Sequence, residues 1–286
     1  MSWIEMMQQS IQYMEEHLLE DITIDQIAEQ AHASPFHFQR LFLILTDVTV
    51  GEYIRRRRLT LAAQELTTSD AKIIDIALKY GYETPEAFAK AFRKQHGSSP
   101  SDVRGRGGKL KSYNRLMIQV SLKGAEPVNY RIEEHEGFQV AGVKKSFSIQ
   151  DGENLIGIPL FWQEFNSSGQ DEELIQLNNG KIKGWLGVCT DFCAENGHTF
   201  DYWIGTAHEG DNTGAFQTMS IPASRWAIFE VRGAMPDAIQ SVWKQIHSEW
   251  FPSHPYEHAG TPDFELYFEG DTSSSDYLSE IWIPIK

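Results

Sequence analysis

Cysteine is scarce in this sequence, and long apolar runs are missing. Only two cysteines, Cys189 and Cys193, occur in 286 residues, which is too few for a disulfide framework and favours free thiols in a reducing compartment. No stretch approaches the roughly 18 consecutive apolar residues of a membrane-spanning helix. The opening "MSWIEMMQQSIQYMEEHLLE" is amphipathic and acidic, unlike a secretory signal. We therefore expect a cytoplasmic protein that does not enter a membrane.

The motifs of common cofactor and metal chemistry are also missing. The sequence holds no glycine-rich phosphate loop and no serine nucleophile elbow. His254 and His258 have a spacing that could hold zinc, but Pro255 lies between them and no other ligands cluster nearby. We predict no cofactor, no metal site and no catalytic residue.

Basic residues are outnumbered, and the excess of acid is uneven. The chain carries 25 Lys and Arg against 40 Asp and Glu, for a net charge of −15. Residues 1–106 hold 12 basic and 15 acidic residues (net −3), so the remainder holds 13 and 25 (net −12). Between them, "RGRGGKLKSYN" is rich in glycine and base, which is typical of a linker. We expect domains at 1–106 and 126–286, joined by a linker at 107–125.

The N-terminal part contains one pattern twice. "IAEQAHASPFHFQRLF" (Ile27–Phe42) and "IALKYGYETPEAFAKAF" (Ile76–Phe92) both open with Ile-Ala, and they reach a turn at His32 and Gly81. Glycine takes a positive φ without strain, and histidine tolerates it better than most residues. Each copy is predicted to be a helix, a tight turn and a second helix, the helix-turn-helix pattern.

Both second helices begin with the same signal. Ser34-Pro35 and Thr84-Pro85 place a hydroxyl at the N-cap, where it accepts a backbone N–H, and a proline at the next position. Apolar residues then recur at helical spacing on one buried stripe: Phe38, Leu41, Phe42 and Leu45 in the first copy, and Phe88, Ala91 and Phe92 in the second.

Removing the buried stripes leaves two exposed faces suited to DNA. Arginine can bond guanine, glutamine can bond adenine, and an exposed phenylalanine can contact a thymine methyl, whereas lysine suits phosphates. For a single unit, an ordinary scaffold helix with solvated polar residues is an equal alternative, but two copies in matched register favour DNA binding. The predicted DNA-binding residues are Phe36, His37, Gln39, Arg40, Glu86, Ala89, Lys90 and Arg93.

A long helix is predicted between the two units. In "VGEYIRRRRLTLAAQEL" (Val50–Leu66), apolar residues recur at helical spacing. A rigid connection would allow two reading helices to enter successive major grooves ~34 Å apart. Most of Arg55–Arg58 are expected on a solvated helix face, with one or two of them near a phosphate.

These motifs resemble the DNA-binding domain of the AraC/XylS family of bacterial transcription regulators over about residues 8–104. The resemblance is carried by "DIALKYGYETPEAFAKAFRKQHGSSPSDVR", including its closing Gly97 and Pro100. It implies seven helices, a double-stranded DNA partner, and one groove read by Phe36, Gln39 and Arg40. Glu86, Ala89 and Lys90 match the second unit's base-facing positions. The first two are unlike the donor-bearing residues often found there, so we expect weaker reading of the second groove.

The remaining residues predict an α+β domain. Strands are expected at "VNYRIEE" and "FQVAGVKKSF", a helix at Asn154–Phe165 despite Pro159, and strands at "GWLGVCT" and "FDYWIGTAH". The order recurs as the strand "RWAIFEV", the helix "PDAIQSVWKQIHSEWF" and the strands "DFELYFE" and "SEIWIPI". Two pseudo-symmetric strand-helix-strand-strand repeats around a central cleft follow from this order.

The strand near residue 265 suggests a pocket wall. Alternation puts Phe264, Leu266 and Phe268 on one face, suited to packing against the helices, and Glu265 and Tyr267 on the other. A carboxylate among aromatic rings is the chemistry that holds an organic cation, each ring adding ~0.5–2 kcal/mol, and a buried carboxylate requires a positive partner. A solvated strand residue is an equal alternative for Glu265 from the pattern alone.

Residues 126–286 resemble the GyrI-like (Rob-type) effector domain, through "VAGV", "IPASRWAIFEVRG", "VWKQIHSEWFPSHPYEH" and "FELYFEGD". The resemblance implies that Glu265 lies in a cleft between the two repeats, where aromatic rings enclose lipophilic, often cationic, compounds. The matching aromatic candidates are Trp185, Tyr202, Trp203, Trp226, Tyr267 and Trp282.

Three functions follow from these expectations. The first is a transcription regulator that binds DNA with its N-terminal half and senses a small lipophilic cation with its C-terminal half. The second is a hydrolase acting on a small electrophilic compound with Glu265 as base, which would need a raised pKa. The third is a DNA-binding protein whose C-terminal half docks onto a protein such as RNA polymerase.

Overall fold

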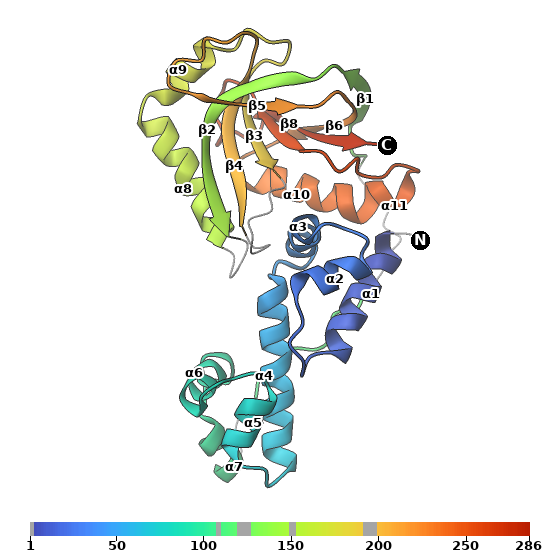
Figure 1. Ribbon diagram of the computed structural model, residues 1–286, viewed down its shortest axis with the longest axis vertical. Helices are drawn as coiled ribbons and strands as arrows, with labels where there is room; N and C mark the ends of the chain where they lie inside the picture. Colours follow the sequence, from blue (N-terminus) through green and yellow to red (C-terminus); the bar gives the residue numbers. More distant parts are fainter. Residues whose placement is uncertain (1–2, 107–109, 119–126, 149–152, 191–198) are drawn as a thin grey trace. The chain divides into compact units, whose positions relative to one another are not determined.

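The computed structural model describes residues 3–106, 110–118, 127–148, 153–190 and 199–286 (Figure 1). These residues form two compact units. The first unit comprises Met1–Gln39 and Val48–Ser121, and the second comprises Arg40–Asp47 and Leu122–Lys286. Within the described residues, no helix is both long enough and apolar enough to cross a membrane. The domain boundaries at 106 and 126 stay predictions.

Seven helices make up the described N-terminal part, as the sequence predicts. Buried aromatic and aliphatic side chains hold them together, with Phe88 and Phe92 packed against Leu59 and Leu66. The helices are α1 (Trp3–Glu16), α2 (Ile24–Gln30), α3 (Pro35–Thr46), α4 (Val50–Thr68), α5 (Ile73–Lys79), α6 (Pro85–His96) and α7 (Pro100–Arg106).

The predicted caps and turns are confirmed. The Thr84 hydroxyl accepts the Ala87 N–H at the start of α6, and the Ser34 hydroxyl accepts the His37 N–H at the start of α3. In the two turns, His32 has φ 49° and Gly81 has φ 83°. Both helix pairs therefore use a left-handed residue at the same place, and only one of these residues is glycine.

The second unit contains an eight-stranded sheet whose neighbouring strands are all antiparallel, in the order β1-β6-β8-β7-β3-β4-β2-β5. Its strands are β1 (Tyr130–His135), β2 (Phe138–Ser148), β3 (Trp185–Thr190), β4 (Thr199–His208), β5 (Gln217–Ile221), β6 (Ser224–Arg232), β7 (Phe264–Tyr267) and β8 (Leu278–Ile285).

The strand order follows the pseudo-symmetry of the two repeats, except that the edge strands β1 and β5 are exchanged between them. β3 and β7 pair at the centre, and β2-β4-β3 on one side corresponds to β6-β8-β7 on the other. β1 and β2 are consecutive in sequence but do not pair with each other. Instead β1 pairs with β6 of the second repeat, and β5 pairs with β2 of the first.

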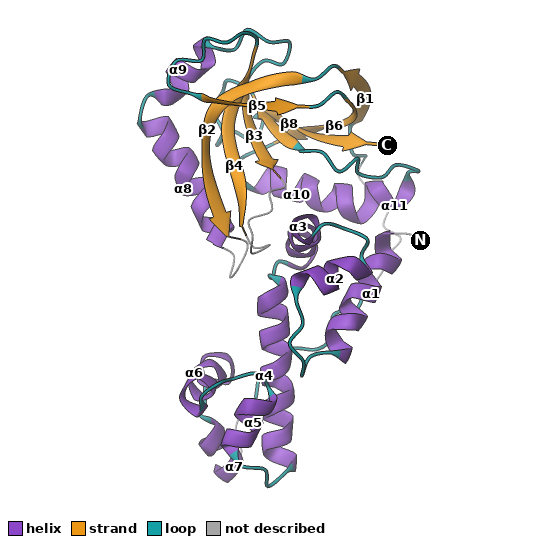
Figure 2. Ribbon diagram, in the orientation of Figure 1, coloured by secondary structure: helices purple, strands orange, loops and turns teal. Residues whose placement is uncertain are grey.

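Helices cover one face of the sheet (Figure 2). α8 (Glu153–Ser167) packs on β2, α9 (Gln170–Gln176) on β4, and α10 (Asp237–Gln245) on β6 and β8. A π-helical segment, η2 (Ile246–Trp250), and α11 (Phe251–Ser253) follow α10. Pro159 lies inside α8 and not in its first turn.

One expectation about the sheet faces is wrong. Phe264 and Leu266 belong to a core cluster formed by the sheet's own side chains, including Trp226 and Trp282. Tyr267 instead packs with the cluster that contains the α10 residue Trp243. The helices therefore lie on the Glu265 and Tyr267 face, because the curved sheet fills its other face with its own aromatic side chains.

Candidate nucleic-acid interface and ligand site

The predicted reading face of α3 is less exposed than its sequence suggests. Phe36 and His37 are half-buried, and Gln39 is only 5% exposed. The Gln39 side-chain amide donates to the Pro35 carbonyl oxygen at 3.3 Å. The expectation that Gln39 points outward is wrong here, because its side chain is buried and bonds back to the backbone of its own helix.

Arg40 makes a buried ion pair instead of lying on an exposed helix face. Its Nη1 donates to Asp263 Oδ1 at 2.5 Å, and the two side chains are 19% and 7% exposed. The guanidinium carbon lies 4.4 Å from the centre of the Trp243 ring. Arg40, Trp243 and Asp263 all belong to the second compact unit. The expected outward position of Arg40 is therefore also wrong.

Charge complementarity holds this pair ionised. Burial alone would lower the pKa of Arg40, but the nearby Asp263 carboxylate outweighs burial and raises it. Burial alone would raise the pKa of Asp263, but Arg40 and His258 outweigh burial and hold that pKa below its usual range. Both groups stay charged at physiological pH, so the pair acts as a fixed cation and a fixed anion.

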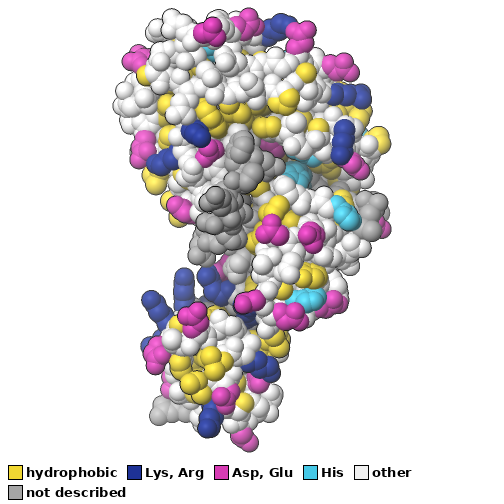
Figure 3. Space-filling model, viewed as in Figure 1, with side chains coloured by type: hydrophobic (Ala, Val, Ile, Leu, Met, Phe, Trp, Pro, Cys, Tyr) yellow, Lys and Arg dark blue, Asp and Glu magenta, His cyan; other side chains and the backbone are white. Residues whose placement is uncertain are grey.

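The second helix-turn-helix unit keeps its predicted face open. Glu86, Lys90 and Arg93 on α6 are exposed, and Ala89 is half-buried. Figure 3 shows Lys and Arg side chains gathered on the surface of the first unit. Lys90 and Arg93 lie on the side of α6 opposite the buried Phe88 and Phe92 stripe, which suits contact with phosphates.

The four arginines of α4 mostly make internal contacts. Arg57 bonds Glu15 at 2.8 Å, Arg56 bonds Glu52 at 2.5 Å, and Arg55 also bonds Glu52. Arg58 donates to the carbonyl oxygens of Leu18 and Glu20. Arg57 and Arg58 therefore fix α4 against residues 15–20, whereas Arg55 and Arg56 make ion pairs within α4 itself.

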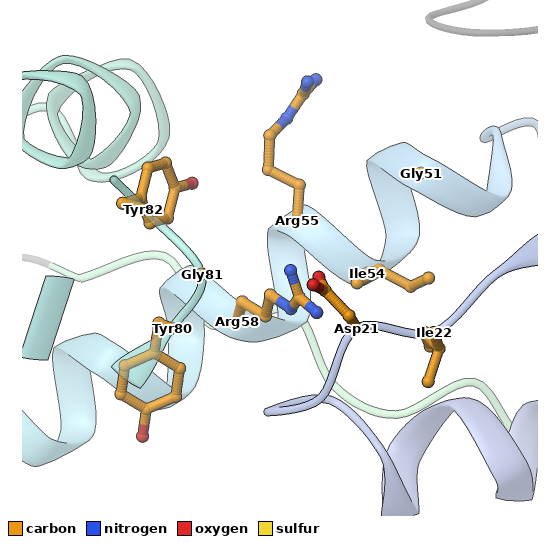
Figure 4. Close-up of a pocket in the computed structure, with 9 residues that line it drawn as sticks. All are labelled: Asp21, Ile22, Gly51, Ile54, Arg55, Arg58, Tyr80, Gly81 and Tyr82. Carbon is orange, nitrogen blue, oxygen red and sulfur yellow. The ribbon is translucent and has the colours of Figure 1, made fainter. Parts of the chain in front are cut away.

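A small pocket lies in the first unit, next to α4 (Figure 4). Its volume is about 320 Å³, and its lining includes Asp21, Ile54 and Tyr82. In the figure, Arg58 and Asp21 point toward one another. A β-carbon at Gly81 would lie 2.7 Å from Arg58 Nη1, so glycine there makes room for the arginine as well as for the turn.

In the second unit, Glu265 is the centre of an acidic and aromatic site. Its carboxylate accepts hydrogen bonds from Trp243 Nε1 and from the Tyr267 hydroxyl, each at 2.7 Å. Burial raises the pKa of Glu265, although these two hydrogen bonds and the Arg40 charge act in the opposite direction. The two donors hold the carboxylate as an oriented acceptor within aromatic walls.

Further aromatic groups surround this carboxylate. Trp162 of α8 donates to the Tyr202 hydroxyl oxygen at 2.9 Å, and its ring meets Tyr267 edge-on at 5.3 Å between centroids. Gly187 is paired with Glu265 across the strands. A β-carbon at Gly187 would lie 2.3 Å from the Tyr202 hydroxyl oxygen, so glycine creates the space that this hydroxyl fills.

Strand register divides the predicted aromatic residues into two sets. Trp185 pairs with Tyr267, and Cys189 pairs with Tyr202. Directly paired residues, and residues two apart on a strand, share a face. Trp185, Tyr202 and Tyr267 therefore lie on the Glu265 face, as expected.

The other three predicted aromatics lie on the opposite face. The core cluster that contains Phe264 and Leu266 includes Trp203, Trp226 and Trp282. The expectation that they surround Glu265 is corrected here. Trp203 is the neighbour of Tyr202 on β4, and neighbours on a strand alternate between faces. Trp282 pairs with Phe264, and Trp226 pairs with Pro284, two residues from Trp282, so both share the Phe264 face.

The structure adds three residues that the sequence did not single out for this site: Trp162, Trp243 and Asp263. Trp243 has the spacing of an ordinary core residue on its helix, and Asp263 precedes β7. Only the packing of distant helices on the sheet brings Trp162 and Trp243 to the site, whereas Asp263 lies two residues before Glu265 in the sequence. Among the described residues, no group of three or more metal-ligating side chains occurs. Cys193 lies outside the described residues.

Comparison with known proteins identifies both halves. The profile of the GyrI-like small molecule binding domain matches residues 128–286, and that of a helix-turn-helix domain matches residues 27–106. Regulatory protein SoxS of Salmonella typhimurium is 41% identical over 106 residues, covering 37% of this chain and 99% of SoxS. Transcriptional regulator Rob of the same organism is 30% identical over 163 residues, covering 54% of each chain.

A solved structure also resembles the second half. The structure of SAV2435 bound to tetraphenylphosphonium has a TM-score of 0.50 and 26% identity, and covers 55% of this chain and 94% of that chain.

The paired helix-turn-helix units and the GyrI-like sheet define a DNA-binding transcription regulator with a small-molecule-binding domain. The chain belongs to the GyrI-like family, joined to an AraC-type DNA-binding domain.

Proposed function

We propose that this regulator reads a specific DNA sequence with α3 and α6, and that the Glu265 site senses a lipophilic organic cation. In this proposal Phe36, Gln39 and Arg40 contact bases in one groove. Glu86, Ala89 and Lys90 face the second groove, where Lys90 and Arg93 contact the DNA backbone. We also propose that the protein works in the cytoplasm, because that is where its proposed DNA partner lies. An RNA polymerase partner stays a prediction.

The observation that carries the ligand half of the proposal is the oriented Glu265 carboxylate. Two hydrogen-bond donors, Trp243 and Tyr267, aim it within aromatic walls. An ionised carboxylate in such surroundings favours a positive guest, because an unpaired buried charge is costly. Tetraphenylphosphonium, the ligand named for SAV2435, is a cation of this kind.

Calorimetric titration of the full-length protein with tetraphenylphosphonium tests the ligand half. We expect binding by the wild type and at least tenfold weaker binding by Glu265→Gln, which keeps the shape but removes the charge. The exposed Glu269 gives a matched control, and Glu269→Gln should bind like the wild type. Equal affinities for the wild type and Glu265→Gln would refute the assignment of Glu265.

DNA selected by the full-length protein from a random-sequence pool tests the DNA half. A base contact contributes ~1–3 kcal/mol of discrimination, so Gln39→Ala and Arg40→Ala should each lose preference for the selected sequence. If both variants prefer it as strongly as the wild type, α3 is not the reading helix.

We also propose that the Glu265 site binds without turnover. Its carboxylate already accepts two hydrogen bonds from protein donors, an arrangement that suits a fixed anion better than a base that must take up a proton. Hydrolysis of a small ester that is lost in Glu265→Gln would contradict this part of the proposal.

A further inference from the structure

The second compact unit already contains a cation at its acidic and aromatic site. Arg40 pairs with Asp263 at 2.5 Å and lies over the Trp243 ring at 4.4 Å. The Trp243 indole, in turn, donates to Glu265. One aromatic ring thus contacts the Arg40 guanidinium with its face and the central carboxylate with its N–H group.

The contacts on either side of Arg40 belong to the same unit. Asp47, just after the end of α3, accepts a bond from Lys244 of α10 at 2.6 Å. Between them, Ile44 packs against the apolar cluster that contains Trp243 and Trp250. An ion pair at each end and an apolar contact in the middle therefore hold residues 40–47 along this cluster.

One guanidinium cannot bond two acceptors that lie in different places. In the proposed function Arg40 contacts a base edge in DNA, yet in this structure the same group is paired with Asp263 and stacked on Trp243. Bidentate bonding to guanine needs the Arg40 N–H groups in the plane that the base occupies. Pairing with Asp263 and reading of DNA by Arg40 are therefore mutually exclusive.

Removing Arg40 from this place leaves a buried carboxylate to be neutralised. Asp263 is 6% exposed, and breaking one side of a buried ion pair is strongly unfavourable unless another cation replaces the lost partner. A cation from solution that enters beside Asp263 and Glu265 would supply that charge. A planar cation would in addition stack on Trp243, as the guanidinium does.

We propose that the Arg40 side chain occupies the Glu265 site as a cation supplied by the protein itself. A planar organic cation of the guanidinium or amidinium class displaces Arg40 from this site and frees it to read DNA. This inference rests on the proposed function and defines its regulation. Because the ligand binds better to the state in which Arg40 is free, it shifts the protein toward DNA binding. By linkage, DNA must raise the affinity for the cation by the same factor.

Phenylguanidinium is the probe, and the full-length protein is titrated with it in the absence of DNA. Arg40→Ala vacates the place beside Asp263 and should raise the probe's affinity by about tenfold, a typical size for such coupling. Arg232→Ala is the matched control: it removes an exposed arginine from β6 and should leave the probe's affinity unchanged.

The second arm measures binding to the selected DNA without any probe. Asp263→Asn keeps the shape of the side chain but removes its charge, so it should bind this DNA about tenfold more tightly than the wild type. Added phenylguanidinium should then have little further effect on the variant. Glu257→Gln, at an exposed acid of the same segment, should behave like the wild type in both assays.

The two experiments distinguish this inference from the proposed function on which it rests. Both gains are required: an unchanged probe affinity in Arg40→Ala, or an unchanged DNA affinity in folded Asp263→Asn, overturns the inference. A melting curve establishes that the variant is folded, and the Arg40→Ala arm stands independently of it. If Glu265→Gln still weakens tetraphenylphosphonium binding while these gains are missing, the proposed function stands and only the displacement of Arg40 is refuted.

Discussion

At the scale of single residues, the neighbouring carboxylates of Glu265 and Asp263 have pKa values shifted in opposite directions. Burial raises the pKa of Glu265, whereas at Asp263 the charges of Arg40 and His258 together outweigh burial and lower its pKa. Glu265 therefore changes charge above its ordinary pKa of 4.5, and Asp263 changes charge below its ordinary pKa of 3.8. The two carboxylates can be distinguished by pH alone.

This difference predicts a pH-dependent affinity for tetraphenylphosphonium. Glu265 attracts the cation only when ionised, so the wild-type affinity should fall as pH is lowered through the raised pKa. Asp263 stays ionised over this range and contributes no slope. Calorimetric titrations between pH 5 and pH 8 measure the effect, and Glu265→Gln, which cannot ionise there, should show a nearly flat profile. A flat profile in the wild type would contradict the raised pKa.

The same pKa shift has a defined sign for stability. A carboxyl group whose pKa is higher in the folded state binds its proton more tightly there, so its contribution to stability decreases as pH rises from 4.5 toward the raised value. Glu15, whose pKa is lowered in the folded state with Arg57 and Tyr53 as partners, contributes in the opposite direction. Its stabilisation is present above pH 4.5 and is lost as pH falls through its folded pKa.

At the scale of elements, the two helix-turn-helix units have the same structural motif, with different residues at the turn. Their helices, caps and buried stripes follow from the sequence because each depends on residues within one or two turns. The pairing partners of β1 and β5 do not follow from the sequence, because several strands have similar alternating patterns and the partners lie far apart in the chain. For the same reason Trp243 has the sequence pattern of a core residue and only the fold shows its bond to Glu265.

Exchanging the turn residues tests this equivalence. His32→Gly should stabilise the protein by up to ~1 kcal/mol, because glycine takes φ 49° without a steric penalty. Gly81→Ala should destabilise it by more than ~1 kcal/mol, because φ is 83° and the new β-carbon would meet Arg58. Urea unfolding monitored by circular dichroism measures both, and changes of the same sign in the two variants would contradict the matched turns.

At the scale of the whole molecule, the net charge of −15 opposes DNA binding except at a local basic face. Lys90 and Arg93 are exposed on α6, while the α4 arginines are engaged with Glu15, Glu52 and backbone carbonyls. The charges available for phosphates are thus few and concentrated. Composition predicts an acidic protein, but the fold decides which basic residues remain available.

A salt titration tests this distribution of charge. Replacing Lys90 or Arg93 by alanine should weaken binding to selected and unrelated DNA alike, and reduce the slope of log affinity against log salt by about one. Lys181→Ala, at an exposed lysine of the second unit, is the control and should leave the slope unchanged. Fluorescence anisotropy at several salt concentrations measures these slopes. An unaltered slope in both α6 variants would exclude phosphate contacts by this helix.

The exchanged edge strands have a consequence for how the sheet can change. Because β1 borders the second repeat and β5 borders the first, each half completes its hydrogen bonding only with a strand from the other. Neither half can be removed or duplicated alone without exposing two unpaired strand edges. The two repeats therefore form one indivisible sheet, whose halves can differ in their side chains but cannot be separated.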